Sequence, residues 1–429
     1  MPPKRAGDSP SRSAAAARRD PPAEAESPWV RLRSVSYHPF LYARMIADVS
    51  PDARPGDVVA VYDRRGAFFG RGLYNPRSQI AVRMLRHGPG PVDGAFWRQR
   101  ISEAVALRRR TLHLDLCTDA YRLVHAEGDG LSGLTAERYA DHVVLEVFAL
   151  GVFQRADMLS RLLREELGSP GSDGGADWTV QVRADERVQQ IEGFRVTEVD
   201  VAPADAGSAR PRRVGGRLVV REHGVRYRVD VHRGQKTGFF CDQRDNRRAL
   251  AALCRDADVL DVCCYTGGFG LCARVVGGAA SVTGVDLDEQ AVALARENAN
   301  LNQVRAQFVH ADAFPYLRQA LANNRQYDAV VVDPPKIVAT RAELPDGRQR
   351  YLDLNKLALG LVRPGGVLLT CSCSGLVSRD DFLDVVRHAA RVAGRRIVLF
   401  NQTGAAPDHP VAPDCPETAY LKALWLRVL

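Results

Sequence analysis

The stretch Asp261-Val-Cys-Cys-Tyr-Thr-Gly-Gly-Phe-Gly270 decides the fold class of this chain of 429 residues. It completes the apolar run Val259–Val262 and opens a helical pattern, as a strand does when it turns into a helix. Glycines let the backbone approach a ligand closely, and a helix N-terminus favours an anionic group. The stretch lacks the G-x-G-x-x-G spacing of a dinucleotide site. It therefore predicts a strand–turn–helix ligand site of another kind.

The sequence around this stretch alternates between apolar runs and helical patterns as far as the C-terminus. Such alternation is typical of a parallel sheet covered by helices, which makes the fold class α/β. The predicted strands are Val259–Val262, Ser281–Val285, Ala306–His310, Ala329–Val332, Gly366–Cys371 and Arg396–Phe400. The predicted helices between them include Glu289–Asn300 and Asp380–Ala393.

Polar residues follow each of the next four predicted strands. They are Asp286, Asp312, Asp333 and the stretch Cys371-Ser-Cys-Ser-Gly375. Ligands of open α/β sheets bind at the carboxyl ends of the strands, where an acid such as Asp286 can take both hydroxyls of a ribose. A single acid after a strand is often only a turn residue or a helix cap. Several in register predict one ligand site at this edge.

The rest of the chain divides by pattern into three further segments. We predict a disordered polar tail over residues 1–27, a small β-rich domain over 28–92 and a central domain, a helix followed by mixed α+β structure, over 93–216. The sheet described above then occupies residues 217–429. Within the central domain, Gly168–Ala176 and Pro203–Gly216 are predicted loops.

The composition is that of an ordinary globular protein, with 45% hydrophobic and 26% charged residues. No apolar run approaches the roughly 18 residues of a membrane-spanning helix, and the tail lacks the apolar core of a secretory signal. The nine cysteines show no zinc-binding spacing and suit a reducing compartment. We expect a cytoplasmic protein with no metal and no membrane partner. The net charge of +8 permits a nucleic-acid partner.

In combination, these motifs resemble the bacterial large-subunit ribosomal RNA cytosine-5 methyltransferase family, a class I S-adenosylmethionine-dependent group. The resemblance covers the chain beyond the tail. It rests on His38-Pro39-Phe40, Tyr74–Ile80, Glu127–Leu134, Arg138-Tyr139, Lys236–Arg247, Tyr265–Gly268, Asp333-Pro-Pro335, Ser372–Gly375, His409-Pro410 and Glu417 to Lys422. It implies an N-terminal PUA domain, which is a small RNA-binding β-barrel. A mixed central domain and a C-terminal Rossmann-like methyltransferase domain would follow.

The resemblance also implies roles for the residues of the sheet edge. Asp261 and the turn of Thr266, Gly267 and Gly268 would hold the methionine part of S-adenosylmethionine. Asp286 would bind the ribose hydroxyls and Asp312 the adenine amine. Gln243 and Arg244 would approach the methionine carboxylate, although the stretch that contains them also fits a capped helix start.

A cytosine-5 methyltransferase needs a cysteine, because carbon 5 becomes nucleophilic only after a thiolate has added to carbon 6. The resemblance places that nucleophile at Cys373. Cys371, two residues earlier, fits a core position better, and the alternative that both are core cysteines stays open. Asp333 would bind the cytosine amine or N3 edge, on a loop fixed by Pro334. Many relatives carry a second cysteine where this chain has Lys336, so the base that removes the carbon 5 proton is unassigned.

The predicted partner is large-subunit ribosomal RNA, unpaired or locally opened around the target base, because the base must leave its stack. Arg108 and Arg109 of a basic cluster, together with Lys336, are predicted to contact RNA phosphates, although a solvated surface role fits each of them as well. Two other functions stay open: methylation of another RNA atom, guanine N7 first, and a non-catalytic RNA-binding assembly factor with the same fold. A homodimer also stays open.

Overall fold

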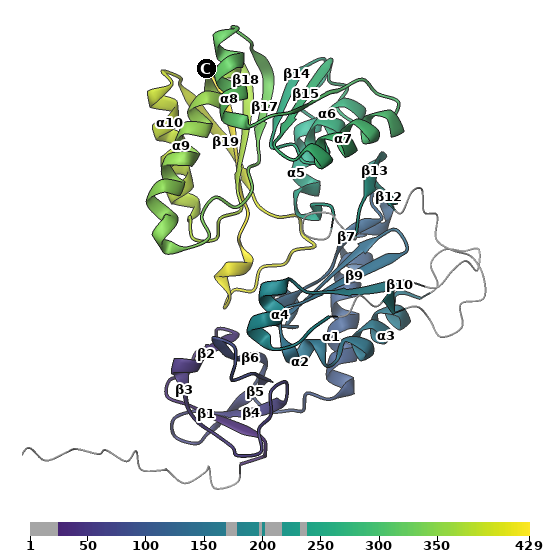
Figure 1. Cartoon of the computed structure of the whole chain (residues 1–429), viewed down its shortest axis with the longest axis vertical. Coiled ribbons are helices and arrows are strands. Elements are labelled where there is room, and N and C mark those ends of the chain that lie inside the picture. Colours follow the sequence, from purple (N-terminus) through teal and green to yellow (C-terminus); the bar gives the residue numbers. More distant parts are fainter. Residues whose placement is uncertain (1–24, 169–177, 197–199, 202–216, 232–237) are drawn as a thin grey trace, which may run out of the picture.

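The computed structural model describes residues 25–168, 178–196, 200–201, 217–231 and 238–429. Residues 1–24 of the predicted tail and almost all of the two predicted loops lie outside the described residues. Figure 1 shows three sheet-containing parts that follow one another along the long axis of the molecule. Within the described residues, no helix is both long enough and apolar enough to cross a membrane.

The N-terminal part is a six-stranded sheet with the order β2-β6-β5-β4-β1-β3. Alternating apolar side chains along its strands form one small core that includes Val30, Val59 and Val82. The strands are β1 Trp29–Leu32, β2 Phe40–Tyr42, β3 Ile46–Val49, β4 Val58–Tyr62, β5 Phe68–Tyr74 and β6 Ile80–His87.

The central part begins with helix α1, Gly94–Ala106, capped by the side chain of Asp93, which accepts the N–H of Phe96. The helix continues as a π-helical turn, Leu107–Thr111. A five-stranded sheet with the order β11-β10-β9-β8-β7 packs on α1 and α3. Its elements are β7 Ala120–His125, β8 Leu134–Tyr139, β9 His142–Val147, α2 Leu150–Phe153, α3 Ala156–Leu167, β10 Thr179–Arg183, α4 Glu186–Glu192 and β11 Asp200–Val201.

A hairpin of β12, Leu218–Glu222, and β13, Val225–Val229, joins the central part to the C-terminal part. The C-terminal part is a seven-stranded sheet with the order β16-β15-β14-β17-β18-β20-β19. Its other strands are β14 Asp258–Val262, β15 Ser281–Asp286, β16 Gln307–His310, β17 Tyr327–Val332, β18 Val362–Ser372, β19 Ile397–Thr403 and β20 Lys422–Val428.

The first five strands of this sheet along the chain are parallel, as predicted. All six predicted strands run in one direction, but the prediction missed a seventh strand, β20, which inserts between β18 and β19 and runs antiparallel to both. No strand was predicted over residues 422–428, of which only Lys422 belonged to a quoted motif. Because of this insertion, the C-terminal strand lies directly beside the strand that ends at Cys371 and Ser372.

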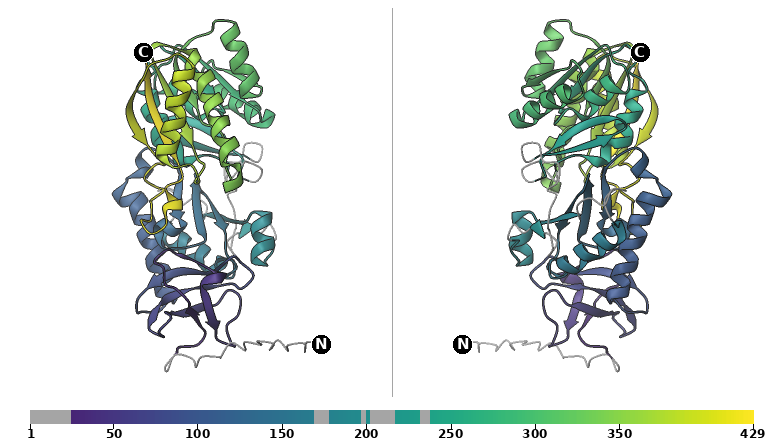
Figure 2. Two further views of the ribbon diagram at one scale, coloured as in Figure 1. Left: turned by 90° about the vertical axis from the view of Figure 1, so that its left-hand side faces the viewer. Right: turned by 90° about the vertical axis from the view of Figure 1, so that its right-hand side faces the viewer.

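Helices cover both faces of this sheet (Figures 1 and 2). Successive residues of β14 and of β17 alternate between two cores. Val259 and Val331 face one core, while Leu260 and Val332 face the other. On the first side lie α5 Arg244–Ala251, α6 Gly268–Val275 and α7 Glu289–Leu301. On the second side lie α8 Ala313–Ala322, α9 Leu344–Leu361 and α10 Arg379–Val392.

Candidate active site

The glycine turn after β14 surrounds a buried acid, Asp261. Gly267 adopts φ +84° and caps α6, and a Cβ on it would meet the ring of Phe308 at 2.8 Å. Asp261 is fully buried, and its Oδ2 accepts the N–H of Gly270 at 2.8 Å. Its Oδ1 has no hydrogen-bond partner among the described residues. Burial raises the pKa of Asp261 to about 7.

A buried carboxylate oxygen without a partner costs free energy unless a ligand satisfies it. The arrangement at Asp261 therefore fits a ligand that brings an ammonium or amine group to the mouth of the glycine turn. The turn itself is closed by main-chain contacts. Thr266 is buried, and its carbonyl oxygen accepts the side-chain amide of Asn298 at 3.2 Å.

Asp286 ends β15 beside this turn. One of its oxygens accepts the N–H of Tyr265 at 2.7 Å and the other accepts the N–H of Asp288 at 2.9 Å. Both oxygens keep a further lone pair, which leaves room for two hydroxyl donors. Asp312 is exposed and caps α8 by accepting the N–H of Phe314 at 2.8 Å. The structure thus places Asp261, Asp286 and Asp312 after three neighbouring strands of one sheet edge.

Asp333 follows β17 on the same edge, with its N–H bonded to the carbonyl of Val262 in β14 at 3.2 Å. Its Oδ2 accepts the side-chain amide of Gln243 at 3.0 Å. The Gln243 amide is itself oriented by Asn246, which donates to Gln243 Oε1 at 2.6 Å. Gln243 therefore lies against Asp333, and its approach to the methionine carboxylate stays a prediction.

Cys373 lies just beyond the end of β18, on a turn that three hydroxyl groups fix in place. The hydroxyl of Tyr351 on α9 lies 2.9 Å from Ser372 Oγ and 2.9 Å from Ser374 Oγ. Ser374 Oγ also accepts the N–H of Val338, which ties this turn to the Asp333 loop. The two serines thus anchor the turn on either side of the thiol. The Sγ of Cys373 lies 3.9 Å from the carbonyl oxygen of Pro334.

The two cysteines at this position differ in their surroundings. Cys371 is fully buried, and burial raises the pKa of its thiol well above the usual value. Cys373 is half-buried. A thiolate nucleophile needs access to its substrate and a tolerable cost of ionisation. Cys373 meets the first condition better than Cys371.

Lys422, at the first position of β20, is a site residue that the sequence analysis missed. It pairs with Ser372 in the register of β18 and β20. Its Nζ donates to the carbonyl of Ser374 at 2.6 Å and to that of Tyr420 at 2.8 Å. Nothing in the local sequence marks this position as close to Cys373. Only the antiparallel pairing brings the two together.

Three arginine predictions need correction or restriction. Arg108 is fully buried, and its guanidinium forms two bonds to Asp129 at 2.7 and 2.9 Å. It is therefore an interior residue of the central part and has no surface to offer an RNA phosphate. Arg109 keeps partial exposure while it donates to Asp115 at 2.8 Å. Arg244 is buried in an ion pair with Asp408 at 2.9 Å, so its charge is held by that carboxylate.

Asp408 is the point where the central and C-terminal parts meet. Besides Arg244, its Oδ2 accepts the N–H of Arg122 at 2.9 Å and its carbonyl accepts Arg108 at 2.6 Å. Burial raises the pKa of Asp408, but the neighbouring His409 and the guanidinium of Arg244 outweigh burial and hold this pKa well below its usual value. The buried charges at this junction are therefore paired with one another.

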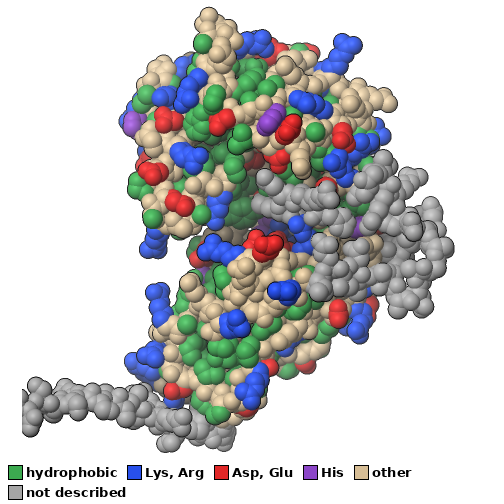
Figure 3. All heavy atoms as spheres, in the orientation of Figure 1, with side chains coloured by type: hydrophobic (Ala, Val, Ile, Leu, Met, Phe, Trp, Pro, Cys, Tyr) green, Lys and Arg blue, Asp and Glu red, His purple; other side chains and the backbone are tan. Residues whose placement is uncertain are grey.

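The other predicted substrate residues lie on the Asp333 loop. Pro334 is buried and Lys336 is exposed. On one face, the molecule is hollowed between the C-terminal part and the rest of the chain, and Lys and Arg side chains gather at the edges of the hollow (Figure 3). Exposed basic groups around a hollow suit an anionic partner.

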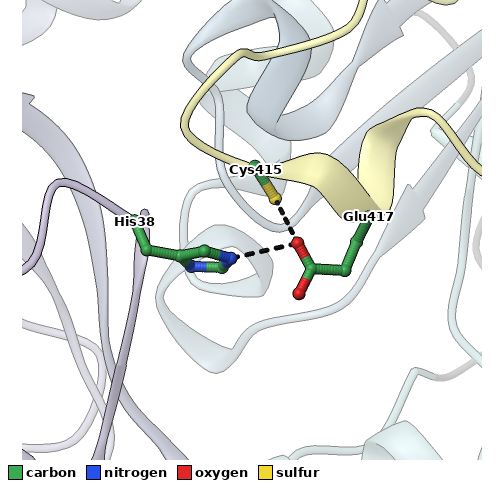
Figure 4. A group of neighbouring side chains, drawn as sticks. All are labelled: His38, Cys415 and Glu417. Carbon is green, nitrogen blue, oxygen red and sulfur yellow. Dashed lines mark hydrogen bonds and ion pairs between the residues drawn. The ribbon is translucent and has the colours of Figure 1, made fainter. Parts of the chain in front are cut away.

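His38, Cys415 and Glu417 form a second cluster, where the N-terminal part meets the C-terminal segment (Figure 4). Their ligand atoms lie within 4.8 Å of one another, which is compatible with a metal ion. However, Nδ1 of His38 accepts the N–H of Phe40 at 3.0 Å, so the proton belongs on Nε2, which donates to Glu417 at 3.0 Å. A metal on Nε2 would force a proton onto Nδ1, facing that N–H. We interpret the cluster as a hydrogen-bonded contact that joins the N-terminal part to the C-terminal segment.

Comparison with protein families gives two matches. A model of S-adenosylmethionine-dependent methyltransferases matches residues 214–427, and a model of PUA-like domains matches residues 33–87. The chain is 36% identical over 396 residues to ribosomal RNA large subunit methyltransferase I of Pseudoalteromonas atlantica, covering 91% of this chain and 95% of that protein. The Escherichia coli protein of the same name is 35% identical over 397 residues, covering 91% and 96%.

Solved structures show the same fold. A putative methyltransferase complexed with SAH aligns with a TM-score of 0.74 and 20% identity, covering 91% of this chain and 96% of that one. A putative methyltransferase from Streptococcus mutans gives a TM-score of 0.74 and 19% identity, covering 93% and 100%. The predicted architecture, a PUA-like β domain followed by a mixed part and a Rossmann-like methyltransferase sheet, is thereby confirmed.

Proposed function

Because the chain belongs to the ribosomal RNA large subunit methyltransferase I family, we propose that it methylates carbon 5 of a cytosine in large-subunit ribosomal RNA. Its cofactor is S-adenosylmethionine, which supplies an electrophilic methyl group. The reaction would proceed through a covalent adduct between Cys373 and carbon 6 of the base. The observation that carries this proposal is the half-buried Cys373, held on an anchored turn beside Asp333.

The sheet edge fits the cofactor. The unpartnered Oδ1 of Asp261 would accept the amino group of the methionine moiety, and the main chain of the turn at Gly267 and Gly268 would approach the same moiety. The remaining lone pairs of Asp286 would accept the two ribose hydroxyls, and Asp312 would accept the adenine amine. The acceptor chemistry of each acid matches the donors that it would face.

Two residues of the chain would act on the target cytosine, Cys373 as the nucleophile and Asp333 as the group that holds the base. The thiolate of Cys373 adds to carbon 6, and the electron pair released into the ring makes carbon 5 nucleophilic. Asp333, oriented by Gln243, would accept the cytosine amine and hold the ring in place. After carbon 5 has gained the methyl group, its proton leaves to a base. The carbon 6–sulfur bond then breaks, and its electron pair returns to sulfur.

The test compares two cysteine variants on one substrate. The purified protein, Cys373→Ala and Cys371→Ala are each incubated with S-adenosylmethionine and unmodified large-subunit ribosomal RNA, and modified nucleosides are identified by mass spectrometry. We expect 5-methylcytosine from the unmodified protein and from Cys371→Ala, and none from Cys373→Ala. Methylated guanine that persists in Cys373→Ala would refute the proposal in favour of guanine N7 chemistry.

A trapping experiment tests the covalent step itself. In RNA that carries 5-fluorocytidine, the fluorine cannot leave carbon 5 as a proton does, so the adduct persists. We expect a covalent protein–RNA complex that survives denaturation, with the RNA attached to the Cys373 peptide. RNA binding without adduct or methyl transfer would instead point to a non-catalytic assembly factor.

A further inference from the structure

Lys422 carries a buried positive charge for which the proposed chemistry has so far assigned no role. Its side chain is almost fully buried, at 4% exposure. Lysine is almost never buried without a partner, because an ammonium group loses its hydration there. Both acceptors of Nζ are neutral main-chain carbonyls, of Ser374 and Tyr420. In the described part of the chain, no carboxylate forms an ion pair with it.

The position of this ammonium group is set by backbone pairing. Lys422 lies opposite Ser372 across the antiparallel pair of β18 and β20, and its Nζ reaches Ser374. It therefore contacts the turn on the far side of Cys373 while its own main chain pairs with the near side. A small displacement of Lys422 would move the residues on both sides of the thiol.

The thiol and the ammonium group also interact electrostatically. Burial lowers the pKa of Lys422 to about 8, and the negative charge of a Cys373 thiolate opposes this effect. The exposed Arg379 at the start of α10 acts in the same direction as burial. Opposite charges close together favour the ionised form of both groups. The thiolate therefore stabilises the ammonium group of Lys422, and the ammonium group stabilises the thiolate.

Resting on the proposed function, we propose that Lys422 is a positioning residue for Cys373. Its ammonium group holds the carbonyl of Ser374, and with it the turn that carries the thiol, and supplies the positive charge that keeps the sulfur ionised. The thiol proton leaves to solvent before attack. After methylation the carbon 6–sulfur bond breaks, and the same charge stabilises the thiolate that departs.

The other titratable groups around the turn differ from Lys422 in the sign or the strength of their effect on the Cys373 thiolate. Tyr351 from α9 and Cys371 from β18 both interact with Cys373 and would disfavour its thiolate if they ionised. Asp333 after β17 and Asp242 of the turn before α5 act on Cys371, and acids in this neighbourhood disfavour a second negative charge. Arg379 is exposed, so solvent screens its charge. Lys422 is the buried cation of this set.

The experiment measures the pKa of the Cys373 thiol without RNA. The full chain is alkylated with iodoacetamide between pH 5.5 and 10, and the rate for the peptide that contains Cys373 is read by mass spectrometry. The midpoint of the pH dependence of this rate gives the pKa of the thiol. In Lys422→Met this midpoint should rise by about one pH unit, which slows alkylation about tenfold at pH 7. Lys422→Arg keeps the charge and should restore the midpoint. Lys356→Met, on α9, is the matched control and should leave it unchanged.

A second variant separates charge from hydrogen bonding. Lys422→Gln keeps an N–H donor at this position but carries no charge, so the midpoint of the pH dependence of alkylation should rise as in Lys422→Met. It also keeps the test available if Lys422→Met does not fold, as judged by thermal unfolding and SAH binding. A midpoint that stays unchanged in either folded neutral variant overturns the inference.

The outcomes are distinguishable from those for the proposed function. If 5-methylcytosine disappears in Cys373→Ala but the alkylation midpoint is unchanged in the neutral Lys422 variants, the proposed function stands and the role of Lys422 is wrong. If methylation persists in Cys373→Ala, the proposed function fails, whatever the midpoint does. The role of Lys422 in the reaction then falls with it.

Discussion

Replacing Asp261 with asparagine isolates the buried carboxylate at the end of β14. Burial raises the pKa of Asp261 to about 7, so below neutral pH the ligand-free protein holds a proton there. An ammonium group prefers the ionised carboxylate, and binding must therefore release that proton. The affinity for SAH should fall by up to about tenfold per pH unit below pH 7 and be level above it. Asp261→Asn should bind weakly and without this dependence.

The same carboxyl affects stability, with a sign that follows from the direction of its pKa shift. The folded pKa lies above the ordinary value of 3.8, so the folded state binds the proton more tightly than the unfolded chain. This contribution is fully present below about pH 3.8 and is lost as the pH rises through about 7. The shift of roughly three units corresponds to at most about 4 kcal/mol. Ligand-free Asp261→Asn should therefore lose less stability between pH 5 and 8.

The assay is calorimetric titration of SAH between pH 5.5 and 8, with urea unfolding of the ligand-free protein over the same range. Asp258→Asn, on the same strand, is the matched control. Its carboxylate accepts hydrogen bonds from Ser281 and Arg363, which lower its pKa. An affinity of the unmodified protein that is flat below pH 7, or an Asp261→Asn variant that binds SAH as tightly, would refute the reasoning.

Three further predictions concern the surroundings of the site. Tyr351→Phe removes the hydroxyl shared by the two serines and should cost about 1–2 kcal/mol in urea unfolding, and it should slow methyl transfer at unchanged SAH affinity. Arg108→Met leaves Asp129 buried without its partner and should cost about 3–5 kcal/mol. If Arg108→Met weakened RNA binding at full stability, its interior role would be wrong. If the contact between His38 and Glu417 holds no metal, EDTA and zinc should leave the melting temperature unchanged. A melting temperature that rises with zinc would contradict the metal-free interpretation.

Most of the sheet could be predicted from local sequence because its signal is local. The runs Val259–Val262 and Ala329–Val332 contain enough apolar residues to require burial on both faces, and both lie within observed strands. The acids that follow them were expected at one edge because parallel strands end on the same side. The glycine turn could be predicted from its own residues, without information on contacts far along the chain.

The prediction failed where a residue's surroundings come from far along the chain. Arg108 belongs to a run of three arginines that is typical of a surface, yet a π-helical turn and Asp129 make it an interior residue. The contact between Gln243 and Asp333 joins residues 90 apart and could not be foreseen either, whereas the role of Gln243 at the methionine carboxylate stays a prediction. Neither composition nor periodicity carries information on such pairs.

The turn around Cys373 explains why the site depends on the C-terminal strand. The hydroxyls of Ser372 and Ser374 both contact the hydroxyl of Tyr351, so the polar residues beside the thiol help to fix its position. The remaining support comes from Lys422, which is 48 residues from Ser374 along the chain and reaches it because β20 pairs antiparallel with β18. An isolated β18 would leave Ser374 without this support. The support of the Cys373 turn by Lys422 therefore depends on the pairing of the C-terminal strand β20 with β18.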